Sequence, residues 1–508
     1  MQLFRTKSVE QTIAETGEEG RKLKRSLTWW DLSIMGVAVA VGAGIFSVGA
    51  QAAAFHAGPA VIISFLIAGI VCGAAVMCYA EFASMIPVAG SAYTFTYTTV
   101  GELMAWIIGW DLILEMLFAG SVIAKYWGVS LNDFIRLMGW NVNTDLALGS
   151  FNFDLAPIII VAFFTVLLVF GTKIGARVDG AMTVLKIAIV VFVVIVGFFY
   201  VKASNFTPFI PPSQPAAATT GDGAVSAQMA QPLWQWATGM TPSIYGVPGI
   251  LSGAALVFFA FLGFDVVATA SEETKNPHKN VPLGIGVGML LIIVMYMLVA
   301  IVTTGMVSYK DLAKQDSPSL ATAFELVGAD WAAKIISFGI VLGLATVIMV
   351  LLLGLTRIVF AMSRDGLLPR GLSKTGKHGT PAVLQIVVGV VVALVAALFD
   401  IGVLSDMVNI GTLSAFTLVA ISIPIMRKKR PELPRAFRMP GNPWVPILIA
   451  LANFWLMLNL SVLTWIRFLV WLVIGFAIYF SYGYWHARLG KGDLSETLSD
   501  ETDRAVNG

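Results

Sequence analysis

The sequence is poor in charge. Charged residues make up 12% of its 508 residues, about half of the roughly 25% that is usual in soluble domains. Hydrophobic residues reach 57%, so most of the chain must face lipid. The formal net charge is only +2, which gives no electrostatic reason to expect a nucleic-acid partner. The composition therefore excludes a soluble globular protein and predicts an integral membrane protein.

Cysteine and histidine are scarce as well. The two cysteines, Cys72 and Cys78, lie in one apolar stretch, which excludes a disulfide framework. The four histidines show neither metal-ligand nor catalytic spacing. The sequence has no Ser/His/Asp constellation, phosphate-binding loop or dinucleotide fingerprint. We therefore expect neither an enzyme nor an ATP-driven pump, and no cofactor or metal.

Long apolar runs dominate the rest of the chain. A bilayer core of about 30 Å needs about 20 apolar residues per helix, and this length predicts an all-α protein with about twelve transmembrane helices. The predicted spans lie near 30–54, 59–84, 103–126, 156–172, 179–201, 249–271, 283–307, 332–362, 381–399, 403–426, 444–462 and 464–486.

The positions of lysine and arginine predict the orientation. Most of the 32 basic residues fall on the cytoplasmic side if the N-terminus is cytoplasmic. We therefore expect a multi-pass protein of the plasma (inner) membrane with both termini in the cytoplasm. Residues 1–28 are polar, and residues 488–508 form an acidic tail that we expect to be disordered. The external loop, residues 204–245, is either a linker or a partial cover over an external vestibule.

Two of the spans contain helix-breaking sequence. Gly42-Ala43-Gly44 lies half-way along the first span, and the segment 258–265 lies at a similar depth in the sixth. Paired breaks at corresponding positions of two halves indicate a transporter's binding site near the bilayer midplane. For the first span alone, close helix packing by small residues explains the glycines equally well.

The breaks predict a receptor for a zwitterion. Unwound backbone at Gly42, Ala43 and Gly44 frees N–H groups at the start of a half-helix, which suits a carboxylate. The backbone carbonyls that would face an ammonium group belong to Ala40, Val41, Phe259, Ala260 and Leu262.

Ionisable residues inside the predicted spans are candidates for function because burying them in lipid is costly. Asp111 and Glu115 share one helical face. Lys186 lies roughly 10 Å inside the bilayer and is a candidate proton carrier, unless it extends to the membrane surface. Glu115 either pairs with Lys186 or contacts the substrate, and Asp111 is either functional or a paired structural carboxylate.

Further acidic residues follow the second break. Asp265 comes directly after Gly263-Phe264, and Glu272 and Glu273 end the sixth span. We expect gating or structural roles for these three residues and for Asp111. The alternative for Glu272 and Glu273 is a solvated helix end.

Several motifs together resemble one transporter group. They are Gly42-Ala43-Gly44-Ile45-Phe46, Cys78-Tyr79-Ala80-Glu81-Phe82, Gly90-Ser91-Ala92-Tyr93, Gly109-Trp110-Asp111-Leu112-Ile113-Leu114-Glu115, Gly263-Phe264-Asp265, Ala361-Met362-Ser363-Arg364-Asp365-Gly366-Leu367-Leu368-Pro369 and Asn409-Ile410-Gly411-Thr412-Leu413. As an ordered set over residues 28 to 440, they resemble the amino acid–polyamine–organocation superfamily, and its cationic amino acid transporter branch in particular.

This resemblance implies a LeuT-like inverted-repeat fold. Residues 29–203 would form the first repeat (helices 1–5) and residues 246–427 the second (helices 6–10). Helices 11 and 12, residues 443–487, would be peripheral.

The resemblance also implies a substrate site. Helices 1 and 6 would hold the α-amino and α-carboxyl groups of an L-amino acid. Lys186 matches the helix 5 lysine that replaces a sodium site in proton-coupled members. The other matching positions are Gly42, Ala43, Gly44, Glu115, Phe259, Ala260 and Leu262. Ala43 departs from the usual Ser or Thr, so the carboxylate would meet backbone N–H groups alone.

The side chain of the substrate stays open. Small residues in the eighth span, including Ala345, leave room for a cationic side chain (Lys, Arg or ornithine), whereas bacterial-looking members of this branch favour small neutral amino acids such as alanine. We expect proton symport by alternating access, with an amino acid and protons as partners in the lipid bilayer. The alternatives are an amino acid/polyamine exchanger and a non-transporting sensor, and the sequence leaves a partner subunit open.

Overall fold

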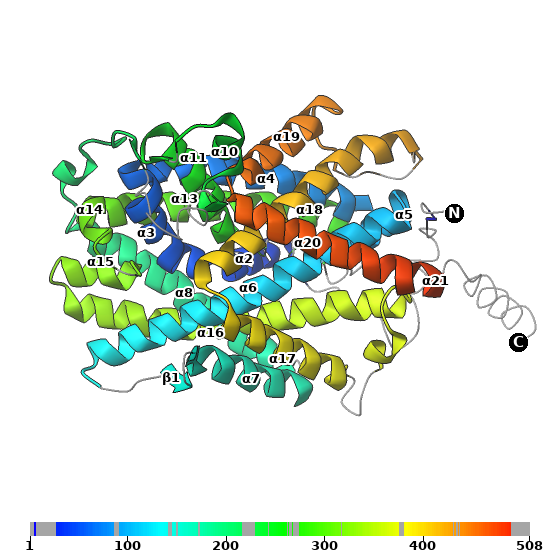
Figure 1. The fold of residues 1–508 in the computed structure, drawn as a ribbon, viewed down its shortest axis with the longest axis horizontal. Helices are drawn as coiled ribbons and strands as arrows, with labels where there is room; N and C mark the ends of the chain where they lie inside the picture. Colours follow the sequence, from blue (N-terminus) through cyan, green and yellow to red (C-terminus); the bar gives the residue numbers. More distant parts are fainter. Residues whose placement is uncertain are drawn as a thin grey trace, which may run out of the picture.

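The computed structural model is a bundle of long helices that run side by side (Figure 1). The structure describes residues 5–6, 27–85, 91–140, 145–148, 151–170, 173–215, 229–241, 243–261, 263, 267, 274–315, 317–374, 380–429, 431–432, 435 and 437–488. The twelve predicted spans coincide with apolar helices in these residues. These helices are α2 (Trp29–Ala40), α4 (Val61–Met85), α6 (Glu102–Leu137), α7 (Leu155–Phe170), α8 (Lys173–Phe198), α11 (Gly246–Val257), α13 (Pro277–Met306), α16 (Asp330–Arg364), α17 (Ala382–Leu398), α18 (Ile401–Lys429), α19 (Trp444–Leu458) and α20 (Val462–Ile478).

Short elements lie between these helices or, in the case of η8 and α21, follow the last of them. They are η1 (Gly44–Val48), α3 (Gly49–Ala52), η2 (Ala53–Ala57), η3 (Gly58–Ala60), α5 (Ser91–Thr99), η4 (Ala203–Phe206), α10 (Leu233–Thr238), η5 (Phe258–Phe261), α14 (Tyr309–Leu312), α15 (Leu320–Leu326), η7 (Arg370–Ser373), η8 (Tyr479–Gly483) and α21 (Tyr484–His486). The strands of the described residues form two antiparallel pairs, β1 (Asp145–Leu148) with β2 (Phe151–Asp154) and β3 (Gln214–Pro215) with β4 (Ser243–Ile244).

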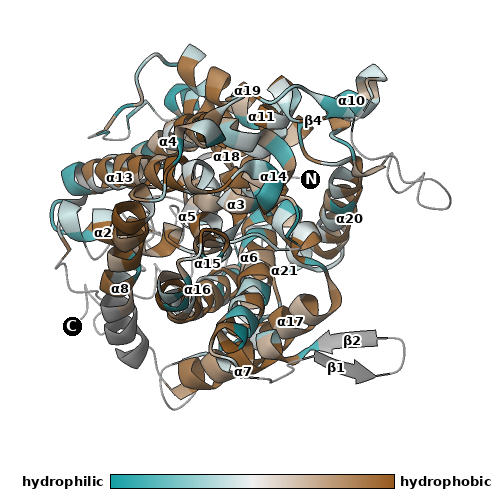
Figure 2. Ribbon diagram, turned by 90° about the vertical axis from the view of Figure 1, so that its left-hand side faces the viewer, coloured by the Kyte–Doolittle hydropathy of each residue, from teal (hydrophilic) through white to brown (hydrophobic). Residues whose placement is uncertain are grey.

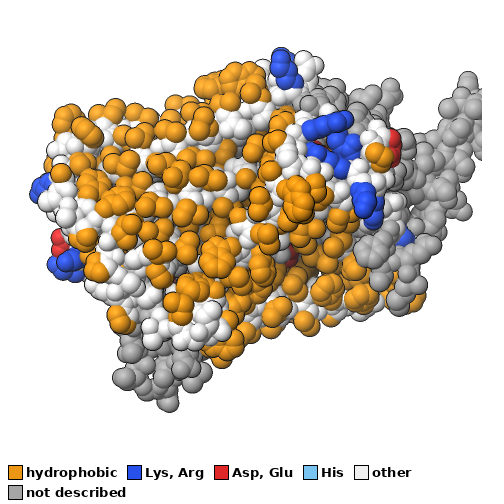
Figure 3. All heavy atoms as spheres, turned by 90° about the horizontal axis from the view of Figure 1, so that it is seen from above, with side chains coloured by type: hydrophobic (Ala, Val, Ile, Leu, Met, Phe, Trp, Pro, Cys, Tyr) orange, Lys and Arg blue, Asp and Glu red, His pale blue; other side chains and the backbone are white. Residues whose placement is uncertain are grey.

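The helices suit a multi-pass membrane protein. In the described part of the chain, six helical stretches are long and apolar enough to cross a membrane, and six apolar helices are shorter. The predicted all-α membrane architecture is confirmed. Peripheral helices such as α7 and α17 are predominantly hydrophobic, whereas hydrophilic residues gather on short segments such as α14 (Figure 2). The face in Figure 3 is covered by hydrophobic side chains along most of its length, as expected of a surface in contact with lipid.

The centre of the bundle is formed by α6 and α16, which pack along each other. Helix α6 is almost entirely buried, and it also contacts α18, whereas α13 packs on α2 and α4. Of the helices that precede the two predicted breaks, α2 packs on α13 and α11 packs on α4, so unwound backbone can find partners away from lipid.

The described part of residues 204–245 is packed onto helix ends. The Tyr245 N–H donates to the carbonyl of His56 over 2.8 Å, and the Leu233 N–H donates to the carbonyl of Leu460 over 2.9 Å. The side chain of Trp234 donates to Asn459 over 2.9 Å. These bonds attach the described part of the segment to the helices, as expected of a packed segment and not of a free linker.

Candidate functional site

The first predicted break is present. Helix α2 begins at a capping box in which Thr28 and Asp31 bond reciprocally, and it ends at Ala40. Val41 has non-helical dihedral angles (φ −71°, ψ 84°), and the chain resumes as the π-helix η1 at Gly44. Carbonyls at the end of α2 and N–H groups at the start of η1 therefore lie next to each other inside the bundle.

The second break meets the first. Helix α11 gives way at Phe258 to the 3₁₀ turn η5, and Gly263 has a positive φ of +87° that favours glycine. The backbones touch at Gly44, where an added Cβ would collide with Ala260. A Cβ on Gly42 would instead meet Val347 at an ordinary 3.6 Å. Gly44 thus permits close packing of the two breaks, whereas Gly42 has room for a methyl group at ordinary contact distances.

A small cavity of about 30 Å³ lies between the breaks and the central helices. The first break contributes Val39, Ala40, Gly42, Ala43 and Gly44, the second contributes Phe259 and Gly263, α6 contributes Ala119 and Ile123, and α16 contributes Val347 and Leu351. None of these residues has a charged side chain. The cavity therefore combines backbone polar groups from the breaks with apolar side chains on the remaining walls.

Five of the predicted binding residues line this cavity: Ala40, Gly42, Ala43, Gly44 and Phe259. Val41 and Ala260 are buried beside it. Ala345 is half-buried on α16 and is absent from the lining, where Val347 and Leu351 represent this helix. Leu262, Asp265, Glu272 and Glu273 lie outside the described residues.

Lys186 is buried beside the first break. Its side chain is 1% exposed, and its Nζ donates a hydrogen bond of 3.1 Å to the carbonyl of Ala38, in the last turn of α2. Its aliphatic stem runs past Gly343 of α16, where an added Cβ would lie 3.2 Å from the lysine Cγ. The lysine therefore does not extend to the membrane surface, and its ammonium group is directed at the helix that unwinds.

The two carboxylates of α6 are also buried, with Glu115 2% and Asp111 0% exposed. Glu115 lies one helical turn from Ala119, which lines the cavity. Asp111 accepts a hydrogen bond of 2.8 Å from the Ser414 hydroxyl of α18, and its Oδ1 has no hydrogen-bond partner among the described residues. The Ser414 bond fits the structural alternative for Asp111, because it ties α6 to α18.

One residue at the breaks was not singled out from the sequence. The hydroxyl of Tyr296 on α13 lies 2.5 Å from the carbonyl oxygen of Ala40 and 2.6 Å from that of Ala260. One side chain thus contacts the backbone of both breaks. In the sequence, Tyr296 could have been noticed only because it is the single tyrosine inside the apolar run of the seventh predicted span.

The described residues contain no group of three or more His, Cys, Asp or Glu side chains that could hold a metal ion. The polar groups that line the cavity are those of the unwound backbone, and Lys186, Glu115, Asp111 and Tyr296 are buried on the neighbouring helices.

Comparison with known proteins adds a second line of evidence. Residues 27–483 match the family model described as "Amino acid permease". The chain is 42% identical to the branched-chain amino acid permease BcaP of Bacillus subtilis, and 39% identical to the methylthioribose transporter of the same species. Each alignment covers 96% of this chain and 99% of the relative. The chain is 37% identical to cationic amino acid transporter 3, mitochondrial, of Arabidopsis thaliana, over 82% of this chain and 64% of that one.

Proposed function

The chain belongs to the amino acid permease family, and from this premise we propose that it transports L-amino acids with neutral, apolar side chains. The observation that carries the proposal is the cavity at the two breaks. Its polar groups come from unwound backbone, and its side chains are uncharged. A zwitterionic head group and an apolar side chain are the chemistry that such a lining complements.

The head group would lie along the breaks. The N–H groups at Ala43 and Gly44 open a half-helix and would meet the carboxylate, where the helix dipole also favours negative charge. The carbonyls of Ala40 and Ala260, and that of Phe259 beside them, would meet the ammonium group. Ala43 supplies no hydroxyl, so recognition of the carboxylate would use backbone alone.

The walls of the cavity support the neutral choice over the cationic one. Ala119, Ile123, Val347 and Leu351 face the substrate position with methyl groups only. A lysine or arginine side chain would lose hydration there without gaining a counter-charge from the cavity wall. Glu115, one turn from Ala119, lies outside that wall. A branched-chain permease among the relatives agrees with this choice, although cationic amino acid transporters are relatives as well.

Lys186 would couple transport to protons. Its ammonium group holds the Ala38 carbonyl at the end of α2. Loss of the proton would remove the charge from this bond and weaken the contact between α8 and α2. Because α2 leads directly into the substrate site, the protonation state of Lys186 would influence how the first break moves during alternating access.

The remaining proposals concern topology. We place the protein in the plasma membrane with both termini in the cytoplasm. We retain residues 29–203 and 246–427 as inverted repeats, with 443–487 peripheral. The correspondence of the two breaks within these halves supports this division.

The test is uptake into proteoliposomes that contain the purified protein. Radiolabelled L-leucine, L-alanine and L-arginine are compared with and without an inward proton gradient. We expect gradient-stimulated uptake of leucine and alanine that exceeds uptake of arginine. Preferred uptake of arginine would overturn the neutral choice. Uptake that requires preloaded amino acid and ignores the gradient would select the exchanger, and binding without flux would select the sensor.

One relative requires an additional arm of the experiment. Methylthioribose carries no ammonium group, so it would leave the carbonyls of the breaks without a charged partner. It is added as a competitor of leucine uptake. Competition stronger than that of unlabelled leucine would contradict an amino acid as the preferred substrate.

A further inference from the structure

Tyr296 joins the two breaks through a single oxygen atom. Its hydroxyl lies 2.5 Å from the Ala40 carbonyl oxygen and 2.6 Å from the Ala260 carbonyl oxygen. Ala40 ends α2, and Ala260 lies in η5, so the two carbonyls come from chain segments that are far apart in sequence. The tyrosine is 0% exposed.

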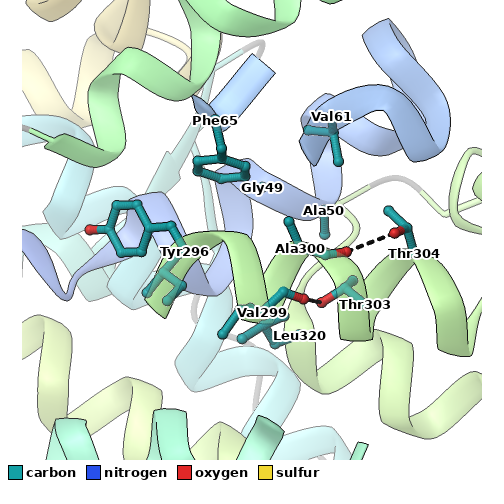
Figure 4. Close-up of a pocket in the computed structure, with 11 residues that line it drawn as sticks. Gly49, Ala50, Val61, Phe65, Tyr296, Val299, Ala300, Thr303, Thr304 and Leu320 are labelled. Carbon is teal, nitrogen blue, oxygen red and sulfur yellow. Dashed lines mark hydrogen bonds between the residues drawn. The ribbon is translucent and has the colours of Figure 1, made fainter. Parts of the chain in front are cut away.

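The aromatic ring is held in place from the sides. It packs edge-on against Phe65, with the ring centres 5.7 Å apart, and in a tilted arrangement against Phe261, with the centres 5.1 Å apart. Beyond the ring lies a second cavity, bordered by Gly49, Ala300 and neighbouring residues. In Figure 4 the hydroxyl oxygen of Tyr296 points away from the rest of this cavity. The position of the hydroxyl is thus fixed by the packing of its ring.

The hydroxyl cannot satisfy both carbonyls. A tyrosine hydroxyl has one proton to donate, and a carbonyl oxygen can only accept. One of the two carbonyls beside Tyr296 therefore receives no proton from it at any moment. A carbonyl oxygen has two lone pairs, so each of these buried carbonyls can accept a hydrogen bond from a further donor when the site is closed. A primary ammonium group has three N–H donors and a positive charge that strengthens each bond.

We propose that Tyr296 and the ammonium group of the substrate share these two carbonyls, the hydroxyl donating to one while the ammonium donates to the other. Tyr296 is then a positioning residue that makes the site specific for a primary amine. The inference rests on the proposed function and extends it. The tyrosine oxygen fills the space beside the ammonium nitrogen, so an added N-methyl group meets this oxygen and also removes one N–H donor.

The test compares two substrates in three proteins. Uptake of L-leucine and of N-methyl-L-leucine is measured in wild type, Tyr296→Phe and Thr303→Val. The Thr303 hydroxyl belongs to the same helix but donates to Val299 of its own chain segment over 2.8 Å (Figure 4). Thr303→Val therefore removes a buried hydroxyl of α13 whose hydrogen bond stays within its own helix, and it serves as the matched control.

We expect wild type and Thr303→Val to have a KM for N-methyl-L-leucine at least about tenfold above that for L-leucine. In Tyr296→Phe the KM for L-leucine should rise by up to about tenfold, the equivalent of one hydrogen bond, because the carbonyl to which the hydroxyl donated loses its partner. The ratio of the two KM values should fall towards one, because the methyl group can occupy the space of the missing oxygen.

A structural role alone would raise both KM values and leave their ratio at the wild-type value, and that result overturns the proposal. If wild type takes up no amino acid, the proposed function fails before any variant is compared. Should Tyr296→Phe not fold, thermal stabilisation of purified wild type by L-leucine and by its N-methyl and N,N-dimethyl derivatives decides the question. Stabilisation that declines with each methyl group supports the proposal, and equal stabilisation overturns it.

Discussion

The ammonium nitrogen of Lys186 lies 3.1 Å from the carbonyl oxygen of Ala38, two residues before the end of α2. A charged group thus holds the last turn of a helix whose unwound end borders the candidate substrate cavity. The bond crosses between α8 and α2, two helices that are distant in sequence, and so it provides a direct physical connection between a titratable side chain and the site.

Replacing Lys186 tests this connection. We expect Lys186→Ala to abolish the stimulation of leucine uptake by an inward proton gradient, because the Ala38 carbonyl loses a donor whose strength depends on a proton. Lys202→Ala is the control, since Lys202 is an exposed lysine outside the predicted spans. The measurement is initial uptake with and without the gradient. Equal stimulation in Lys186→Ala and wild type would exclude the lysine from coupling.

The two glycines of the first break should respond differently to one added methyl group. In Gly44→Ala the new Cβ collides with the backbone of Ala260, so we expect a loss of about 1–3 kcal/mol in stability and loss of uptake. In Gly42→Ala the Cβ meets Val347 at 3.6 Å, an ordinary contact. We expect this variant to keep the fold and to transport alanine better than leucine, because the methyl group enters the cavity.

Thermal unfolding in detergent and the alanine-to-leucine uptake ratio check this pair. Equal thermal stability of the two variants would contradict the close contact between Gly44 and Ala260.

The sequence revealed those parts of the site that depend on local composition. Glycines in the middle of an apolar run predict a break in the helix, whatever the neighbouring helices are. The breaks at Gly42 and at Phe258 are confirmed. The depth of Lys186 in its span follows from counting residues at 1.5 Å each. These features need no knowledge of neighbouring helices.

Other parts depend on which face of a helix turns inward. Ala345 was predicted from its depth in the eighth span, but Val347, two residues later, lines the cavity. Residues two apart on a helix are rotated by about 200° about its axis. Ala345 and Val347 therefore lie at nearly the same depth in the helix but on nearly opposite faces. Tyr296 was missed for the same reason, because its importance arises from carbonyls on two other segments.

Val347 should limit the size of the side chain that the cavity accepts. Val347→Ala removes two methyl groups opposite Gly42. We expect the KM for L-phenylalanine to fall by about tenfold relative to the KM for L-leucine. A change of this size is within the range of substrate discrimination that one or two methylene groups produce. Val390→Ala on α17, a change of the same size at a side chain that is 52% exposed, is the control. Competition of both amino acids against labelled leucine gives the ratio, and an unchanged ratio would exclude Val347 from the side-chain pocket.

A buried ion pair connects the end of α4 to α18. Glu81, which is 0% exposed, accepts two hydrogen bonds from Arg427 over 2.8 and 2.6 Å and a third from the Met439 N–H over 2.7 Å. A second paired arginine, Arg136, contacts Glu325 over 2.7 and 2.9 Å with the same two-bond geometry, but its side chain is 57% exposed. The two pairs differ in burial, and each has a further ionic neighbour: Arg435 lies 3.8 Å from Glu81, and Asp133 lies 3.7 Å from Arg136.

This difference predicts unequal effects of the same substitution. Glu81→Gln leaves the charge of Arg427 without its partner in a buried position, and we expect a loss of about 3–5 kcal/mol in stability. Glu325→Gln should cost about 0.2–1 kcal/mol, because solvent screens the exposed pair and can replace it. Thermal unfolding of both variants in the same detergent gives the comparison. If the two variants unfolded at the same temperature, the buried pair would contribute no more to stability than the exposed pair. The connection between α4 and α18 would then depend on apolar packing.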